Sequence, residues 1–257
     1  MIKLENAVFP SADQMEFVIQ GMRNPMNSWD KSDSTKCKYG MECDICEHSF
    51  YSCNEFSLGE NDWKLMRTLA HAGSDHRKFM RMMSVYVRIT APLYWWKEFD
   101  TYKIGTVSNS CSTMHKIAEK EFTLEDFSHE HLGVTIPDEK NDGDECYQKL
   151  WMAASIKSTV GALNIARDYY IRENDGVLKK DYWWQMIQLL PSSYNQTRNV
   201  MLNYEVLANI YRQRQNHKLD EWREFCKWIK KLPYSKLITG SIMLTKDFIV
   251  DNSGEDK

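Results

Sequence analysis

The stretch "SVYVRITAPLYWWKEF", residues 84–99, decides the fold. Its first half alternates, so that Val85, Val87 and Ile89 point to one side of an extended chain and the residues between them point to the other. This period of two predicts a strand with one buried face. Pro92 follows the strand, and proline is well tolerated in the first turn of a helix. We therefore expect a strand that leads directly into a helix ending near Phe99.

Small polar residues dominate the segment beyond this helix, "TVSNSCST" at 106–113. Hydroxyl and amide side chains of this size do not fill a hydrophobic core. The segment also lacks the glycine and proline that are typical of turns. We expect it to be a loop whose hydrogen-bonding groups contact something other than the core.

The composition is that of a globular protein. The chain has 257 residues, of which 42% are hydrophobic and 12% aromatic. This length is enough for one large domain or two small ones. We expect one domain over residues 1–257, with a cysteine-rich insertion at about 35–55 and a disordered tail at about 250–257.

Charge and hydropathy exclude two classes of partner. The formal net charge of −3 argues against a nucleic-acid polymer, and the sequence has no run of eighteen apolar residues that would span a membrane. The N-terminal "MIKLENAVFPSADQ" has no apolar signal core, so we expect a cytoplasmic protein. The seven cysteines are then expected to be reduced thiols or metal ligands.

Apolar residues at helical spacing recur along much of the chain. They predict a first helix around residues 15–22 and a second at 62–72, which Asn61 or Asp62 would cap at its start and Gly73 at its end. Further helical patterns cover residues 147–174, 180–190, 196–214 and 219–232. The buried stripe of the longest consists of Ala153, Ile156, Val160, Leu163, Ala166 and Tyr170. With many helices and few strands, the expected class is α+β, mostly helical with a small mixed or antiparallel sheet.

Cysteine and histidine cluster between residues 37 and 53. Thiolates bind zinc well, and a Cys-x-x-Cys pair is the usual half-site. The candidate ligands are Cys37, Cys43, Cys46, His48 and Cys53. A zinc ion held by four of them would be structural, because a closed ligand set leaves no position for a substrate. Their irregular spacing leaves a reduced surface loop as the alternative.

A charged segment, "GSDHRKF" at 73–79, follows the second predicted helix. His76, Arg77 and Lys78 offer donors for a phosphate, and a solvated turn is the alternative. A metal-dependent phosphohydrolase would need a His-Asp pair and separate histidine and aspartate ligands, which the sequence does not offer here. The "HEH" at 129–131 is expected to lie on the surface.

One predicted helix carries two polar residues on an apolar stripe. Asn203, Leu207, Ile210 and Arg214 follow one another at spacings of four, three and four residues. An asparagine and an arginine on an inward face need partners. They would find them either in an internal hydrogen bond or ion pair, or in a ligand bound in a groove.

Three segments together resemble the flavin-dependent thymidylate synthases, the ThyX superfamily. They are "YVRITAPLYWWKEF" with the polar segment after it, "IQLLPSSYNQTRNVMLNYEVLANIYRQR", and the tryptophan and acidic residues of "DEW". In that family a strand ends in Ala-Pro, and a helix and a signature motif follow. A later Leu-Pro precedes a helix that starts at an asparagine and carries an arginine eleven residues on, as Asn203 and Arg214 do here. The resemblance covers about residues 60–230.

The resemblance places the family signature on residues 101–113, where no signature residue is kept identically. Lys103, Thr106 and Cys111 are chemically close to the arginine and the two serines expected there, whereas Thr113 replaces an arginine. The family's flavin-contacting histidine falls near Ser74. The nucleotide- and cofactor-binding residues implied by the resemblance and the charged turn are His76, Arg77, Lys78, Tyr102, Lys103, Thr106, Ser108, Asn109, Cys111, Thr113, Asn203 and Arg214.

The resemblance implies a ThyX-like homotetramer whose sites lie between subunits. It implies a reaction that moves a methylene group from folate to carbon 5 of deoxyuridine monophosphate, with reduced FAD supplying a hydride. The polar segment would then be a loop against nucleotide and flavin whose charged residues are replaced by neutral ones. Charge-assisted hydrogen bonds to phosphate are about twice as strong as neutral ones. Activity would therefore require compensation by residues such as Arg77, Lys78, Lys103 or Arg214.

Three functional hypotheses follow. The first is a divergent flavoenzyme that acts on a deoxyuridylate-like nucleotide. The second is a catalytically inactive protein that binds or sequesters a nucleotide on the same fold, and the third is an interaction protein without a ligand. The sequence identifies no catalytic residue, because Cys111 would be a nucleophile only with a base beside it.

Overall fold

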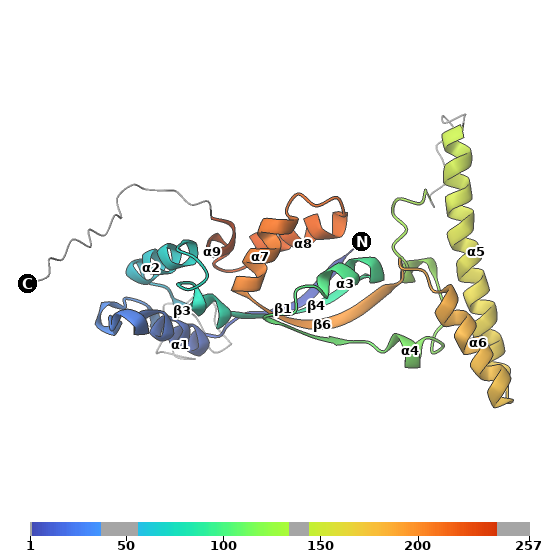
Figure 1. Cartoon of the computed structure of the whole chain (residues 1–257), viewed down its shortest axis with the longest axis horizontal. Coiled ribbons are helices and arrows are strands. Elements are labelled where there is room, and N and C mark those ends of the chain that lie inside the picture. Colours follow the sequence, from blue (N-terminus) through green and yellow to red (C-terminus); the bar gives the residue numbers. More distant parts are fainter. Residues whose placement is uncertain (1, 37–55, 134–143, 241–257) are drawn as a thin grey trace, which may run out of the picture.

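The computed structural model describes residues 2–36, 56–133 and 144–240 of the chain. Its centre is a four-stranded antiparallel sheet in the order β1-β4-β6-β5 (Figure 1). The strands are β1 (Lys3–Val8), β4 (Ser84–Pro92), β5 (Thr106–Ser110) and β6 (Asn195–Asn203). The α+β class with a small sheet is confirmed, and the sheet is antiparallel throughout.

Helices surround this sheet and extend beyond it. The remaining elements are α1 (Ala12–Arg23), two 3-10 turns at Asn24–Met26 and Trp29–Lys31, a second small sheet of β2 (Thr35–Lys36) and β3 (Phe56–Ser57), α2 (Glu60–His71), a 3-10 turn at Lys78–Arg81, α3 (Leu93–Phe99), α4 (Thr113–Lys116), a 3-10 turn at Leu124–Asp126, α5 (Asp144–Arg172), α6 (Gly176–Leu189), α7 (Tyr204–Arg214), α8 (Asp220–Lys230) and α9 (Lys236–Thr239).

The stretch at 84–99 forms the strand and helix that its pattern predicts. Val85, Val87 and Ile89 of β4 are 0–2% exposed and face the helices, whereas Tyr86 on the opposite face is 49% exposed. α3 then packs Trp95 and Phe99 against aromatic side chains of α8. Figure 1 shows α3, α7 and α8 on the same side of the sheet. The hydrophobic effect therefore fixes one face of the sheet and leaves the other uncovered by these helices.

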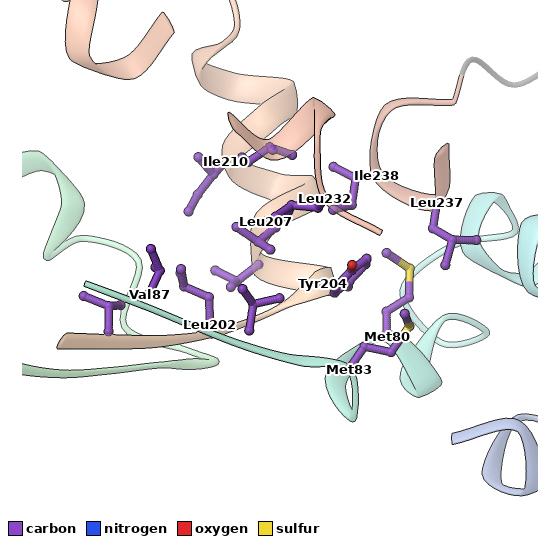
Figure 2. Close-up of a cluster of buried hydrophobic side chains, with 14 of the residues drawn as sticks. Met80, Met83, Val87, Leu202, Tyr204, Leu207, Ile210, Leu232, Leu237 and Ile238 are labelled. Atoms are coloured by element: carbon purple, nitrogen blue, oxygen red, sulfur yellow. The ribbon is translucent and has the colours of Figure 1, made fainter. Parts of the chain in front are cut away.

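The packing of α7 on the sheet positions its two polar ends. Leu207 and Ile210 are fully buried against side chains of β4 and β6, among them Val87 and Leu202 (Figure 2). Asn203 at the start of α7 and Arg214 at its end therefore keep fixed places relative to the sheet.

The helix predicted over residues 196–214 is wrong for its first half. Residues 195–203 form β6, which pairs with β4 over nine consecutive residues and with β5 over five. β6 lies between two strands, so the ladder satisfies the backbone groups on both of its edges. The change from strand to helix occurs at Asn203, whose Oδ1 accepts a hydrogen bond from the backbone N–H of Val206 at 2.9 Å. Long-range strand pairing overrode the local helical spacing.

The loop expected over residues 106–113 is also wrong for its first five residues. Residues 106–110 form β5, the edge strand that pairs only with β6 among the described strands. Because side chains alternate across a strand, Ser108 and Asn109 lie on opposite faces. Both are exposed, and an edge strand with two solvated faces tolerates polar side chains on each of them.

Asp62 does not cap α2, contrary to prediction. The helix starts after Gly59, and the Asp62 carboxylate is 0% exposed and receives a hydrogen bond from Arg23 Nε at 2.6 Å. Ser32 and Ser34 also donate to it. The end of the helix is as expected: Gly73 follows the last cap residue with φ of 118°, a conformation that favours glycine.

α5 and α6 pack together at the end of the molecule farthest from α1 (Figure 1). α5 spans 29 residues and buries the predicted stripe, since Ala153, Ile156, Leu163 and Ala166 are all at most 7% exposed. α6 begins at Gly176, four residues before the predicted start at 180. Asp175 caps it, with Oδ1 accepting from the Val177 N–H at 2.8 Å.

Several predictions concern residues that the structure does not describe. The candidate zinc ligands at 37–53 and the tail at 250–257 lie outside the described residues. Within the described ranges, no cluster of three or more His, Cys, Asp or Glu residues could hold a metal ion. None of the described helices combines the length and apolarity that a membrane crossing needs.

Candidate functional site

Arg214 lies at the centre of a polar network between α3, α7 and α8. Its Nη1 donates to Glu98 Oε2 at 2.9 Å and lies 2.9 Å from His217 Nε2, and its Nε donates to the Tyr102 hydroxyl at 2.9 Å. Trp222 Nε1 donates to the same Glu98 oxygen at 2.8 Å. The arginine is only 20% exposed, so it is held in place by these partners.

Aromatic rings enclose the Arg214 guanidinium. It lies 5.0 Å from the centroid of a Trp222 ring and 5.7 Å from that of Tyr102. Such cation–π contacts stabilise a partly desolvated cation by about 0.5–2 kcal/mol each. The sequence left open whether the polar residues of the Asn203–Arg214 stripe meet an internal partner or a ligand. For Arg214 the structure shows an internal ion pair with Glu98.

A glycine brings β5 against the start of α7. Gly105 has φ of 81°, and a Cβ at this position would lie 2.5 Å from Asn203 Nδ2. Only a residue without a side chain fits this approach. Thr106, next in the chain, donates its hydroxyl to the carbonyl of Tyr102. Tyr102 thus contacts both Thr106 and Arg214, whereas Asn203, at the other end of α7 from Arg214, lies beside Gly105.

Two other predicted residues lie at the far end of β5. The Thr113 hydroxyl accepts from Gln196 Nε2 at 2.9 Å, and the carbonyl of Cys111 accepts from the same nitrogen at 3.2 Å. The Cys111 thiol is free and exposed. These residues do not join Tyr102 and Arg214, because the five residues of β5 separate them, about 16 Å at 3.3 Å per residue.

Arg198, which sequence reasoning did not single out, lies beside this second group. Its Nη1 donates to Asp100 Oδ1 at 2.7 Å, its Nε donates to Gln196 Oε1 at 2.9 Å, and its guanidinium lies 4.2 Å from a Trp96 ring centroid. Glu98 and His217 were missed in the same way. His217 follows Arg214 by three residues, which was the available signal for it, and Trp222 had entered only as part of the "DEW" of the resemblance.

The charged turn lies against the first turn of α7. Arg77 Nε donates to Glu205 Oε1 at 3.2 Å, and Arg81 pairs with the same carboxylate. Burial alone would raise the pKa of Glu205, but the hydrogen bonds from Arg81 and Arg77 outweigh it and lower the pKa below its usual value. His76 and Lys78 are exposed. The turn offers a phosphate less positive charge than its sequence indicates.

Part of the positive charge at the site is neutralised within the chain, although Arg77 and Arg81 share the single carboxylate of Glu205. Arg77, Arg198 and Arg214 each have a carboxylate partner. Among the described residues, no ion pair is formed by Lys78 or Lys103. The site can thus offer two exposed ammonium groups to an anion, and hydroxyl and amide groups to neutral hydrogen-bonding partners.

A cavity of about 760 Å³ lies elsewhere, beside α1. Its lining includes the aromatic side chains of Phe17, Trp29 and Phe56 and the side chain of Arg23. None of the predicted nucleotide-binding residues lines this cavity. The predicted site residues of β5 and α7 thus lie apart from this cavity.

The described architecture is similar to that of solved enzymes. Thymidylate synthase X (ThyX) from Helicobacter pylori, solved with FAD and dUMP, matches with a TM-score of 0.54 over 93% of this chain and 96% of that chain, at 15% identity. The UMP/dUMP methylase PolB from Streptomyces cacaoi, solved with 5-Br dUMP, matches with a TM-score of 0.52 over 90% of this chain and 88% of that chain, also at 15% identity. The fold is that of the flavin-dependent thymidylate synthases.

This ThyX-like fold confirms the architecture that the resemblance implies. No protein-family model matches the chain, and no curated protein matches it either. At 15% identity the likeness establishes the fold, so any activity has to be argued from the residues themselves.

Proposed function

We propose that the protein binds a pyrimidine nucleotide at the surface formed by β5, the turn before it and α7. The likeness to ThyX and PolB carries this proposal, because it covers at least nine-tenths of the chain and those structures hold dUMP or 5-Br dUMP. Tyr102, Thr106, Asn203 and Arg214 gather at this surface.

The neutral and the charged side chains of this surface suit different parts of a nucleotide. Ser108 and Asn109 are exposed on the edge strand and suit the hydrogen-bonding edges of a base or sugar. Lys103 and Lys78 are exposed cations that suit a phosphate. Arg214 would join them only if the incoming phosphate displaced Glu98 from its guanidinium.

FAD is the cofactor that we propose for an active form of the protein. The residues fit its ring edge and ribityl chain better than its diphosphate, because Arg77, Arg198 and Arg214 each face a carboxylate, which leaves neutral donors, two lysines and the exposed Arg212 of α7. Tyr102 and Lys103 are the residues that we expect to hold it. When bound, reduced flavin would supply a hydride, and with a methylene group supplied by a folate the reaction would methylate a deoxyuridylate-like nucleotide at carbon 5.

A specific observation favours a second candidate, a catalytically inactive nucleotide-binding protein. Arg198 and Arg214 each face a carboxylate of the same chain, and Thr113 and the backbone of Cys111 accept hydrogen bonds from Gln196. A site with this charge balance suits ligand binding by neutral hydrogen bonds. In either case we infer a cytoplasmic homo-oligomer, a tetramer by resemblance, whose sites lie between subunits.

An absorbance spectrum of the purified protein from 300 to 550 nm tests the choice between these functions. A flavin band near 450 nm, with FAD released on denaturation, would support the flavoenzyme and lead to an assay of deoxyuridylate methylation. A colourless protein that releases a nucleotide would support the inactive binding protein. A colourless protein that binds neither flavin nor nucleotide when both are added in excess would contradict both.

A further inference from the structure

The cavity beside α1 has the size and the lining of a small-molecule site. Its volume is about 760 Å³, and ligand pockets commonly measure about 300–1,000 Å³. It lies at the end of the molecule opposite α5 and α6 (Figure 1). Since none of the predicted nucleotide-binding residues lines it, its occupant has to be inferred from its own side chains.

Three aromatic side chains from three separate segments line this cavity. Phe17 belongs to α1, Trp29 to the 3-10 turn at Trp29–Lys31, and Phe56 to β3. Phe17 is 64% exposed and Trp29 51%, so much of each ring is not covered by other described side chains. Within the described parts of the chain, none of the three rings stacks on another aromatic ring. Their faces are therefore available to a ligand.

Trp29 is held in one orientation without the use of its ring face. Its Nε1 donates to Asn24 Oδ1 at 2.8 Å, which satisfies the one polar group of the indole. Met82, which also lines the cavity, lies close to α1 because Gly21 has no side chain. A Cβ at Gly21 would lie 3.3 Å from the Met82 sulfur. Part of the lining is thus positioned before a ligand arrives.

The charges around the cavity leave one carboxylate without a partner. Arg23 lines the cavity, but it is 4% exposed and its Nε donates to Asp62 at 2.6 Å. Lys36 pairs with Asp13. Glu16 lines the same cavity and forms no ion pair with a described residue. An anion would therefore meet cations that already have partners, whereas a cation would find a carboxylate that has none.

We propose that this cavity binds an organic cation, a small molecule whose alkylated ammonium group contacts Trp29 and Phe17 and has Glu16 as its counter-ion. A cation is attracted to the face of an aromatic ring, and quaternary ammonium groups are commonly recognised in this way. Alkyl groups also leave no N–H that needs an acceptor, so such a group is accommodated among aromatic rings more easily than a primary amine. A neutral molecule of the same shape would leave Glu16 without a partner.

The proposal is independent of the nucleotide site. Glu16, Phe17 and Trp29 belong to neither β5 nor α7 and are not among the predicted nucleotide-binding residues. Failure of the ammonium proposal would leave the binding of dUMP unaffected. Failure of the nucleotide proposal would likewise leave the binding of an ammonium compound as it is.

Titration of the full chain with choline tests the proposal. Its neutral isostere, 3,3-dimethylbutan-1-ol, has the same shape without the charge. The nine tryptophans are replaced by fluorotryptophan, and the fluorine NMR signal that is missing in Trp29→Phe belongs to Trp29. We expect this signal to shift saturably with choline, and the alcohol to bind at least roughly ten-fold more weakly. Sodium chloride keeps the ionic strength constant, because choline chloride also screens charges.

Glu16→Gln tests the counter-ion. The change removes the charge and keeps the size of the side chain at an exposed position of α1, so the fold should be retained. We expect the Kd for choline to rise roughly three- to ten-fold. Glu121→Gln, an exposed change outside the cavity lining, is the matched control and should leave this Kd unchanged. An unmoved Trp29 signal at about 100 mM choline, equal binding of the alcohol, or an unchanged Kd for Glu16→Gln would overturn the proposal.

Discussion

Nη1 of Arg214 lies 2.9 Å from Oε2 of Glu98, so the arginine at the end of α7 already has an anion beside it. Trp222 donates to the same carboxylate oxygen and fixes it there. In a low-dielectric setting this pair is stable only if both charges stay together. A nucleotide phosphate would have to compete with Glu98 for Arg214, or bind through other groups.

Glu98→Gln should increase the affinity for a nucleotide monophosphate. The change removes the negative charge that neutralises Arg214 but leaves an amide oxygen to accept from Trp222. We expect the Kd for dUMP to fall roughly five- to ten-fold, because Arg214 becomes available to the phosphate and a repulsive charge is lost. Calorimetric titration with dUMP measures this.

The matched control for that change is Glu119→Gln. Glu119 is exposed and pairs with Lys116 within one turn, so its replacement should leave the Kd for dUMP as it is in the wild type. Weaker binding of dUMP by Glu98→Gln would show that the carboxylate itself contacts the ligand, contrary to our assignment.

Lys103→Ala should weaken phosphate binding without loss of stability. Lys103 is exposed and belongs to the turn before β5, so the folded chain does not depend on it. We expect the Kd for dUMP to rise roughly three- to ten-fold, with little change for deoxyuridine, which lacks the phosphate. Equal effects on both ligands would remove Lys103 from the phosphate site, and Lys180→Ala on α6 serves as the control.

Asp62 should support stability in a pH-dependent way. Burial alone would raise the pKa of its carboxyl group, but hydrogen bonds from Ser34 and Ser32 and the Arg23 guanidinium outweigh it and lower the pKa. Asp62→Asn leaves Arg23 buried beside a neutral group, so we expect the free energy of unfolding to fall by about 3–5 kcal/mol at pH 7.

The sign of the pH effect follows from the lowered pKa. The stabilisation is fully present above the unfolded-state pKa of about 3.9 and is lost as the pH falls through the lower folded-state pKa. The difference between wild type and Asp62→Asn in urea unfolding should therefore be constant from pH 7 to pH 5 and shrink below about pH 4. An unchanged difference at pH 3 would refute this account. Asp30→Asn, at an exposed position, should not affect stability.

Cys111 and Cys226 should differ in reactivity. Cys111 is exposed, whereas burial raises the pKa of the Cys226 thiol to about 11. The thiolate is the reactive form, so iodoacetamide at pH 8 should modify Cys111 in the native protein and Cys226 only after unfolding. Peptide mass mapping reads both sites in one experiment, and fast native modification of Cys226 would be inconsistent with the structure.

Local sequence patterns predicted the elements in which one face of a strand or helix is buried against the core. The alternation at Val85, Val87 and Ile89 and the buried stripe from Ala153 to Ala166 were confirmed, because each records which face meets the core. β6 was not predicted, because its pairing with β4 and β5 is a long-range relationship, and the brief alternation of Val200 and Leu202 was outweighed by the helical stripe that begins at Asn203.

The candidate site was predictable only in part for the same reason. Asn203 and Arg214 were found because they stand out on an apolar stripe. Glu98 was not, since an ion pair between α3 and α7 joins residues 116 positions apart and has no local signature. The neutralisation of Arg214 by Glu98 thus depends on the tertiary structure and could not be predicted from the local sequence.

Calorimetric titration of the wild-type protein with dUMP tests the central claim most directly. Our account predicts saturable binding of the nucleotide, with weaker binding of deoxyuridine and a lower Kd for dUMP in Glu98→Gln. An absence of binding at millimolar dUMP, in a folded protein with FAD present and also without it, would contradict the claim and leave a ThyX-like fold without nucleotide binding.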